Sequence, residues 1–240
     1  MPNRLKELFA EVAPTYERAN HILTFGLDRL WRRTAALWAA KSGGRLWLDV
    51  CSGSGDMARA LLCRAGGETR VVAVDFCLPM VKQAVGLKRT LRPLAVGGDV
   101  RCLPFPDSVF DLLTISFATR NIHLSRGALR DTFGEFGRVL KPGGVFINVE
   151  TSQPSSRLVR ALFHTYVKAA IKRVGSRISS SQPGYAYLAS TIPRFYHPEE
   201  LAGILEEAGF SEINWRRLFW GAAAIHRGVK PQCSPPRRNK

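Results

Sequence analysis

Three acidic residues and a glycine-rich turn are the residues of this sequence whose types and spacing first suggest chemistry. Asp49 lies at the end of a short apolar run, just before the turn Cys51-Ser-Gly-Ser-Gly55. Asp75 and Asp99 end two further runs. If the three runs are parallel strands, their carboxyl ends meet at one edge of a sheet, where α/β proteins bind ligands. A single loop acid is often a helix cap, but three at successive strand ends predict one binding site.

The turn also fits a dinucleotide fingerprint, Gly53-x-Gly55-x-x-Ala58, with Asp75 twenty residues after Gly55. Asp49 argues against that ligand, because its carboxylate would repel a pyrophosphate. It suits S-adenosylmethionine, which has a cationic amino group, a sulfonium and no phosphate. Asp75 would accept hydrogen bonds from the ribose hydroxyls, and Asp99 one from the adenine amino group, with Val100 beside the ring.

The charge of the chain is unusual and uneven. The formal net charge is +16, yet residues 46–150 hold 13 basic and 10 acidic side chains. Residues 151–198 and 213–240 each hold seven basic side chains and no acidic one. Such a balance predicts attraction to nucleic acid, anionic lipid or an anionic ligand. Because the excess lies outside the centre of the chain, we interpret it as a docking feature beside a nearly neutral active site.

The five cysteines are scattered and lack the Cys-x-x-Cys or Cys/His spacing of a zinc site. We therefore expect no metal, and reduced thiols in a cytoplasmic protein. The first residues have no secretory signal pattern, and no apolar run approaches the roughly 20 residues of a membrane-spanning helix. The protein is expected to be soluble or peripheral to a membrane.

Alternating patterns of strand and helix must position these residues. They predict an α/β protein with a doubly wound, mostly parallel seven-stranded sheet. The expected strands are 45–50, 70–74, 94–96, 110–117, 145–149, 212–218 and 219–226; the main helices are 4–13, 27–40, 56–64, 79–90, 126–139 and 199–208, with a turn at 141–144. The expected domains are an N-terminal helical lid (1–45), a main domain (46–228) with a helical insertion (about 151–184), and a basic tail (229–240).

The segment LDVCSGSGD (48–56) resembles motif I of the class I S-adenosylmethionine-dependent methyltransferases, which have a Rossmann-like fold. Four segments resemble the quinone-ring C-methyltransferases, which methylate demethylmenaquinone and, in some organisms, a ubiquinone precursor. They are FGLDRLWRR (25–33), LPFPDSVFDLLTISFATRNI (103–122), GRVLKPGG (137–144) and YAYLASTI (185–192). The resemblance implies S-adenosylmethionine as cofactor and a prenylated quinol as substrate, with demethylmenaquinol expected first and a ubiquinone precursor as the alternative.

The resemblance also implies roles for individual residues. The family's cofactor contacts fall on Ser54, Asp75, Asp99 with Val100, and Ser116, beside Asp49, Gly53 and Gly55. Cys51 and Ser52 stand where the family commonly has Ala or Gly. Both are small, but a positive φ at either position would be costly.

Methylation of a quinol carbon requires a phenolate, whose charge spreads onto the neighbouring ring carbon. Arg120 and Asn121 follow the fourth expected strand. We assign Arg120 to stabilising the substrate oxygen and Asn121 to positioning a hydroxyl or water. Tyr16, from the lid, would close over the site and join proton transfer. The alternatives are a surface salt bridge for Arg120 and a base role for His123.

The helical insertion places basic and apolar residues on opposite sides of one helix. Arg157, Arg160, His164, Lys168 and Lys172 form the basic stripe, and Val159, Phe163, Tyr166, Val167, Ala170 and Val174 lie opposite. This suits the anionic inner face of the cell membrane, or a helix packed on the sheet with a solvated basic face. The other functions considered are another small-molecule methyltransferase that uses S-adenosylmethionine, an NAD(P)-dependent oxidoreductase and an RNA methyltransferase. No nucleic-acid partner is expected, and homo-oligomerisation is left open.

Overall fold

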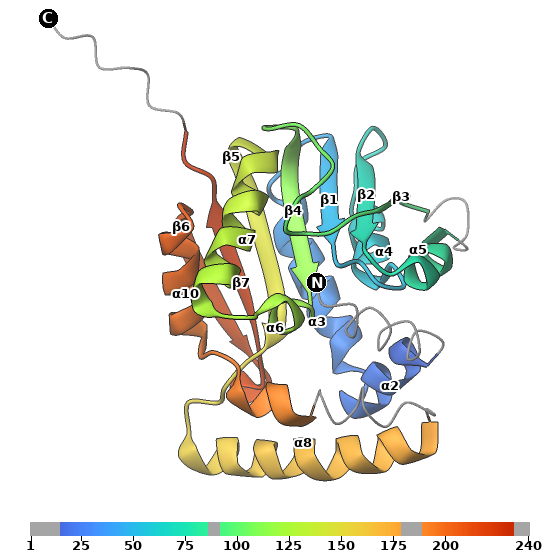
Figure 1. Cartoon of the computed structure of the whole chain (residues 1–240), viewed down its shortest axis with the longest axis vertical. Coiled ribbons are helices and arrows are strands. Elements are labelled where there is room, and N and C mark those ends of the chain that lie inside the picture. Colours follow the sequence, from blue (N-terminus) through green and yellow to red (C-terminus); the bar gives the residue numbers. More distant parts are fainter. Residues whose placement is uncertain (1–14, 86–91, 179–188, 233–240) are drawn as a thin grey trace, which may run out of the picture.

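A single twisted sheet organises the protein. The structure, a computed structural model, describes residues 15–85, 92–178 and 189–232 (Figure 1). The strand order is β3-β2-β1-β4-β5-β7-β6, in which β3 to β5 are parallel neighbours and β7 runs antiparallel to β5 and β6. The strands are β1 (Leu46–Val50), β2 (Arg70–Asp75), β3 (Leu94–Gly97), β4 (Phe110–Ser116), β5 (Leu140–Thr151), β6 (Ser211–Leu218) and β7 (Ala223–Val229). The predicted doubly wound, mostly parallel sheet is therefore confirmed.

Helices cover both faces of this sheet, which explains why its central strands are almost uninterrupted apolar runs. On one face, Phe133 and Phe136 of α7 share a core with Phe146 of β5 and with the apolar side chains of α10. On the other, α3 and α4 pack Trp31 and Met57 against the sheet. The helices are α2 (Tyr16–Leu23), α3 (Leu27–Ala40), α4 (Asp56–Leu62), α5 (Leu78–Val85), α6 (Thr119–Ile122), α7 (Arg126–Val139), α8 (Arg157–Ile178) and α10 (Pro198–Glu207).

Two sequence expectations were wrong near the end of the sheet. The residues expected to form a turn, 141–144, belong to β5 but bulge from it, since Phe110 pairs with Leu140 and Leu112 with Val145. Gly143 donates a hydrogen bond to the Lys230 carbonyl and Gly144 accepts one from the Lys230 N–H, both at 2.9 Å. The last strand begins at Ala223, not at residue 219. Residues Phe219–Gly221 instead form a 3₁₀ turn, in which Phe219 and Trp220 both have positive φ.

The N-terminal helices and the insertion meet at one end of the molecule (Figure 1). The polar stretch before α3 contains α2, and Ala19 of α2 packs against Val167 of α8. The Tyr166 hydroxyl donates a 2.7 Å hydrogen bond to the Leu23 carbonyl, which ties the insertion to α2. The expected helix 4–13, the first half of YAYLASTI (185–188) and residues 233–240 lie outside the described residues. The domain boundaries at 45 and 228 stay predictions.

Candidate active site

A small polar cavity lies where the glycine turn follows β1. Its volume is about 50 Å³, and its lining residues come from the ends of β1, β2 and β4 and from α3. The structure brings together in its wall Gly53, Ser54, Asp75, Ser116 and Asn121, all of which the sequence had singled out. Parallel strands explain this convergence, since their carboxyl ends lie at one edge of the sheet.

Asp75 is held by the backbone of this cavity. One carboxylate oxygen accepts a 2.8 Å hydrogen bond from the Gly53 N–H and the other accepts one of 2.8 Å from the Cys77 N–H. Burial raises the pKa of Asp75, although these backbone hydrogen bonds oppose the shift. The carboxylate is thus fixed in place and still has lone pairs that can accept from ligand hydroxyls.

Asp49 lies beneath the turn and is fully buried. Its Oδ1 accepts a 2.7 Å hydrogen bond from the Thr114 hydroxyl, while Oδ2 has no hydrogen-bond partner among the described residues. Burial raises the pKa of Asp49 to about 7, against the effects of the neighbouring hydroxyls and of the Arg32 charge. A cation arriving nearby would favour the ionised form, so Asp49 can respond to a cationic ligand even though it is not part of the cavity wall.

Three further predicted residues lie outside that wall. Asp99 forms an ion pair with Arg101, Val100 is buried in the core, and Gly55 is the N-cap of α4. The pKa of the Cys51 thiol is raised well above its ordinary value, first by burial and to a smaller extent by the negative charges of Asp75, Asp49 and Asp99. Asp99 is therefore close enough to act electrostatically on Cys51. The three strand-end acids therefore converge around the turn, and the assigned contacts of Asp99 and Val100 stay predictions.

Two residues at the strand ends that enter the site have a strained backbone. Cys51, after β1, has φ 49°, and Phe117, after β4, has φ 55°. Residues other than glycine rarely adopt such values, and strain of this kind often marks functional sites. The cost expected for a positive φ at Cys51 is therefore present in the fold.

A second, apolar cavity of about 410 Å³ lies beside the first. Its walls come from α2, α3 and α8 and from the turn before β7; they include Trp31, Phe117, Phe163, Tyr166 and Trp220. The end of β4 and the residues that follow it contribute to the walls of both cavities. Phe117 and Arg120 line the apolar cavity, while Ser116 and Asn121 line the polar one. A ligand in each would meet across this short segment.

Arg120 belongs to the buried wall of the apolar cavity. Its Nη1 donates to Glu150 Oε1 at 3.1 Å and to Thr151 Oγ1 at 2.9 Å, and its backbone N–H donates to Glu150 Oε2 at 3.1 Å. The side chains of Arg120 and Glu150 are only 5% and 1% exposed. The alternative that Arg120 forms a surface salt bridge is therefore wrong.

The other residues proposed for catalysis are placed differently. Asn121 is buried beside the polar cavity, and its Oδ1 has no hydrogen-bond partner among the described residues. His123 lines neither cavity; its Nε2 lies 2.8 Å from the Tyr196 hydroxyl. A base role for His123 is thus not supported by its position. The side chain of Tyr16 lies outside the described residues.

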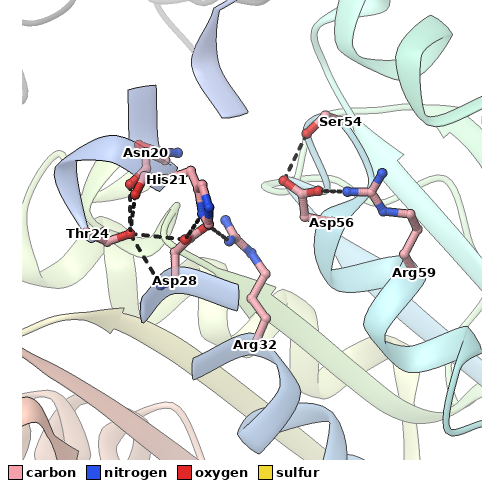
Figure 2. Close-up of polar contacts among 8 residues, drawn as sticks. All are labelled: Asn20, His21, Thr24, Asp28, Arg32, Ser54, Asp56 and Arg59. Carbon is pink, nitrogen blue, oxygen red and sulfur yellow. Dashed lines mark hydrogen bonds and ion pairs between the residues drawn. The ribbon is translucent and has the colours of Figure 1, made fainter. Parts of the chain in front are cut away.

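The sequence interpretation overlooked an ion pair between the two cavities. Asp28 and Arg32 lie one turn apart on α3, and Arg32 Nη1 is 2.7 Å from Asp28 Oδ2 (Figure 2). Asp28 lines the apolar cavity and Arg32 the polar one. The available signal was the i, i+4 spacing of opposite charges within FGLDRLWRR. Because most such pairs are solvated, only the fold reveals that this one is buried.

These features fit S-adenosylmethionine. Asp75 offers acceptors for ribose hydroxyls at the end of β2, and the buried Asn121 Oδ1 lacks, within the described part of the chain, a partner that a ligand donor could supply. Asp49 keeps an oxygen without a hydrogen-bond partner in the described segments, and this oxygen could stabilise a cationic amino group. Unpaired buried polar atoms are uncommon in native proteins, and they are expected where a ligand completes the site.

Comparisons with solved structures identify the fold. A methyltransferase of Haloferax volcanii, solved with the activator Trm112, aligns with a TM-score of 0.68 at 18% identity, over 93% of this chain and 98% of that one. Human N-acetylserotonin methyltransferase in complex with S-adenosylmethionine aligns with a TM-score of 0.61 at 15% identity, over 92% and 59% of the two chains. The fold is that of the class I methyltransferases.

Comparisons of sequence are more specific. The C-methyltransferase UbiE of ubiquinone and menaquinone biosynthesis in Pseudomonas savastanoi is 35% identical over 95% of this chain and 89% of that protein. The Pseudomonas putida protein of the same name is 36% identical, with the same coverage. The family model of the ubiE/COQ5 methyltransferases matches residues 2–230. The chain therefore belongs to the ubiE/COQ5 methyltransferase family, and it is an enzyme that uses S-adenosylmethionine as its methyl donor.

Proposed function

We propose that the enzyme methylates a ring carbon of a prenylated quinol, with demethylmenaquinol as the substrate and menaquinol as the product. The observation that carries this proposal is the composition of the apolar cavity. Its wall is aromatic and aliphatic over most of its surface, and Arg120 is the one basic side chain among the described residues that line it. Similar proteins are named for C-methylation in ubiquinone and menaquinone biosynthesis, which agrees with such a substrate.

The reaction needs a deprotonated ring hydroxyl and an aligned ring carbon. S-adenosylmethionine supplies an electrophilic methyl group. Arg120 would stabilise the phenolate oxygen, because its guanidinium lies in an apolar wall where its charge is poorly screened. Glu150 and Thr151 hold that guanidinium in one orientation. The methyl–sulfur bond would break as the new carbon–carbon bond forms, with S-adenosylhomocysteine as the leaving group. The ring carbon would then lose its hydrogen as a proton to solvent, which restores the aromatic quinol.

The direct test is methyl transfer by the purified enzyme. We expect transfer of labelled methyl from S-adenosylmethionine to chemically reduced demethylmenaquinone, and none to the oxidised quinone, which has no hydroxyl to deprotonate. Mass spectrometry of the quinone fraction measures the product. A ubiquinone precursor with the same prenyl tail, in the same assay, decides between the two ring types. Equal transfer to RNA, or none to either quinol, would contradict the proposal.

We further propose that the mouth of the apolar cavity docks on a membrane, where a prenylated substrate is dissolved. Four residues line this cavity and are also exposed to solvent: Phe25 (78%), Leu162 (64%), Phe219 (55%) and Trp220 (77%). Phe219 and Trp220 are adjacent aromatics with positive φ. Large apolar side chains that are exposed on a strained backbone favour neither solubility nor stability. These four residues, which form the rim of the cavity, are therefore suited to an apolar environment.

The basic residues of α8 only partly match the expected stripe. Arg160 lies 3.1 Å from His197 and His164 lies 2.8 Å from Gln153, so both contact the body of the protein. Leu158 and Leu162 are exposed between Arg157 and Lys168. The exposed face of α8 is therefore mixed, apolar with flanking cations, which is the pattern of surfaces that enter an anionic lipid interface. No helix among the described residues is long and apolar enough to span a bilayer.

A vesicle-binding assay checks this docking surface. We expect the wild type to co-sediment with vesicles that contain phosphatidylglycerol, and the double variant Leu162→Asp/Trp220→Asn to bind about 10-fold less, because it removes two apolar anchors. Asparagine tolerates the positive φ at position 220, so the fold should not suffer. Leu124→Asp is the matched control: Leu124 is 58% exposed but does not line the cavity. An equal loss in this control would contradict the assignment.

A further inference from the structure

Arg32 presents a buried cation to the cofactor cavity. It lies on α3 with only 6% of its surface exposed, and it is the one basic side chain among the described residues that line the cavity. Its Nη1 donates to Asp28, but its Nε has no hydrogen-bond partner among the described residues. A buried guanidinium N–H without a partner is costly unless a ligand completes it.

The position of Arg32 is fixed by its neighbours. Asp28, which it contacts, also accepts hydrogen bonds from Thr24 at 3.0 Å and lies 3.1 Å from His21 Nδ1 (Figure 2). The guanidinium carbon also lies 4.9 Å from the centre of the Phe117 ring. Burial alone would raise the pKa of Asp28, but Arg32 and these hydrogen bonds lower it below its ordinary value, so Asp28 holds Arg32 as a carboxylate.

The glycine turn and the start of α4 line the same cavity opposite Arg32. Ser54 donates to Asp56, and Asp56 pairs with Arg59, as Figure 2 shows. Arg59 does not line the cofactor cavity, whereas Ser54, Asp56 and Arg32 do. A ligand that lies over the turn would therefore meet carboxylates from the turn side and a single cation from α3.

We propose that Arg32 binds the carboxylate of the methionine moiety of S-adenosylmethionine, with Asp28 as its positioning residue. The methionine end carries an ammonium and a carboxylate side by side. Asp49, with its unpartnered oxygen, suits the ammonium, and Arg32 is the available partner for the carboxylate. Since Asp28 also lines the apolar cavity, this ion pair joins the walls of both ligand sites. The inference concerns the cofactor and does not rest on the proposed quinol.

Calorimetric titration with three ligands tests the role of Arg32 without any quinol. S-adenosylhomocysteine has the carboxylate, decarboxylated S-adenosylmethionine lacks it, and methylthioadenosine lacks the whole amino-acid part. For Arg32→Met we expect Kd for S-adenosylhomocysteine to rise about 10- to 100-fold, with less than about a 3-fold change for the other two ligands. Arg33→Met, on the exposed neighbour that does not line the cavity, should leave all three unchanged.

The comparison between ligands separates binding from folding. An equal loss for all three ligands would mean that Arg32 only supports the structure, and no loss for S-adenosylhomocysteine would mean that another group binds the carboxylate; either result overturns the proposal. Should Arg32→Met not fold because Asp28 is left buried and unpaired, Asp28→Asn/Arg32→Met removes that charge and is expected to show the same selective loss. Arg32→Lys, which keeps the cation, should recover part of the affinity for S-adenosylhomocysteine alone.

Discussion

The double variant Arg120→Met/Glu150→Gln is expected to lower kcat for methyl transfer by about 10²- to 10³-fold while leaving the Kd of S-adenosylhomocysteine unchanged. Removal of a fixed charge that stabilises a developing oxyanion has an effect of this size. Arg120 lines the apolar cavity and not the polar one, so cofactor binding should not depend on it. Single-turnover assays with the reduced quinone, beside calorimetry, measure the two quantities.

Both partners are changed because Arg120 and Glu150 form a buried pair. Arg120→Met alone would leave the Glu150 carboxylate buried and unpaired, and breaking one half of such a pair destabilises a protein by about 3–5 kcal/mol. The single variant would therefore mix a folding defect with a catalytic one. Glu150→Gln alone keeps the cation but loosens its position, and it should lower kcat by a smaller factor. Activity of the double variant within about 3-fold of wild type would refute the role of Arg120.

Asp49→Asn is expected to stabilise the cofactor-free protein near neutral pH and to weaken cofactor binding. The pKa of Asp49 is raised from 3.8 to about 7, mainly by burial. Between those two values the folded protein keeps a proton that the unfolded chain has lost. The contribution of Asp49 to stability is therefore fully present below pH 3.8, declines as the pH rises toward 7, and is lost above it.

Asparagine cannot ionise, so it removes this pH dependence. Its carbonyl oxygen can still accept the hydrogen bond from Thr114. We expect the difference in unfolding free energy between Asp49→Asn and wild type to grow in favour of the variant by at most about 1.4 kcal/mol per pH unit between pH 4 and 7. Thermal denaturation at pH 5, 6, 7 and 8 measures it. A difference that is constant with pH would contradict the assigned burial effect.

The same substitution should raise the Kd of S-adenosylmethionine about 10- to 100-fold, because the ammonium group loses a charged partner. Asp107→Asn provides the control, since Asp107 is 75% exposed and lies away from both cavities. It should change neither the pH dependence of stability nor the affinity. Gain of apo stability together with loss of ligand affinity is the pattern of a residue kept for function.

Sequence patterns predicted those features of the fold that depend on residues close together in the chain. The alternation of strand and helix predicted the sheet, and helix 126–139 begins and ends where it was expected. The strand that precedes the glycine turn and the acids at successive strand ends predicted a cavity at that edge of the sheet, because parallel strands bring their carboxyl ends together. The motifs of residues 25–33, 103–122 and 137–144 indicated the family that the comparisons confirm.

Other features depend on partners that are distant in the sequence. Lys-Pro-Gly-Gly at 141–144 has turn composition, yet Lys230 pairs with its backbone and extends β5 through it. His123 lies close to Arg120 in the sequence, but its side chain contacts Tyr196, which follows the insertion in the sequence. The exposed rim of Phe25, Leu162 and Trp220 gathers residues from three separate segments.

The sequence by itself determined the α/β sheet, the position of the polar cavity and the family, because periodicity, turn glycines and contiguous motifs are properties of short segments. Only the tertiary structure decided which charges are buried. Arg120 meets Glu150 from a neighbouring strand, and the Asp28–Arg32 pair is covered when α3 packs against the sheet between two cavities. Burial depends on packing across the whole fold, and it determines how strongly a charge acts on a ligand.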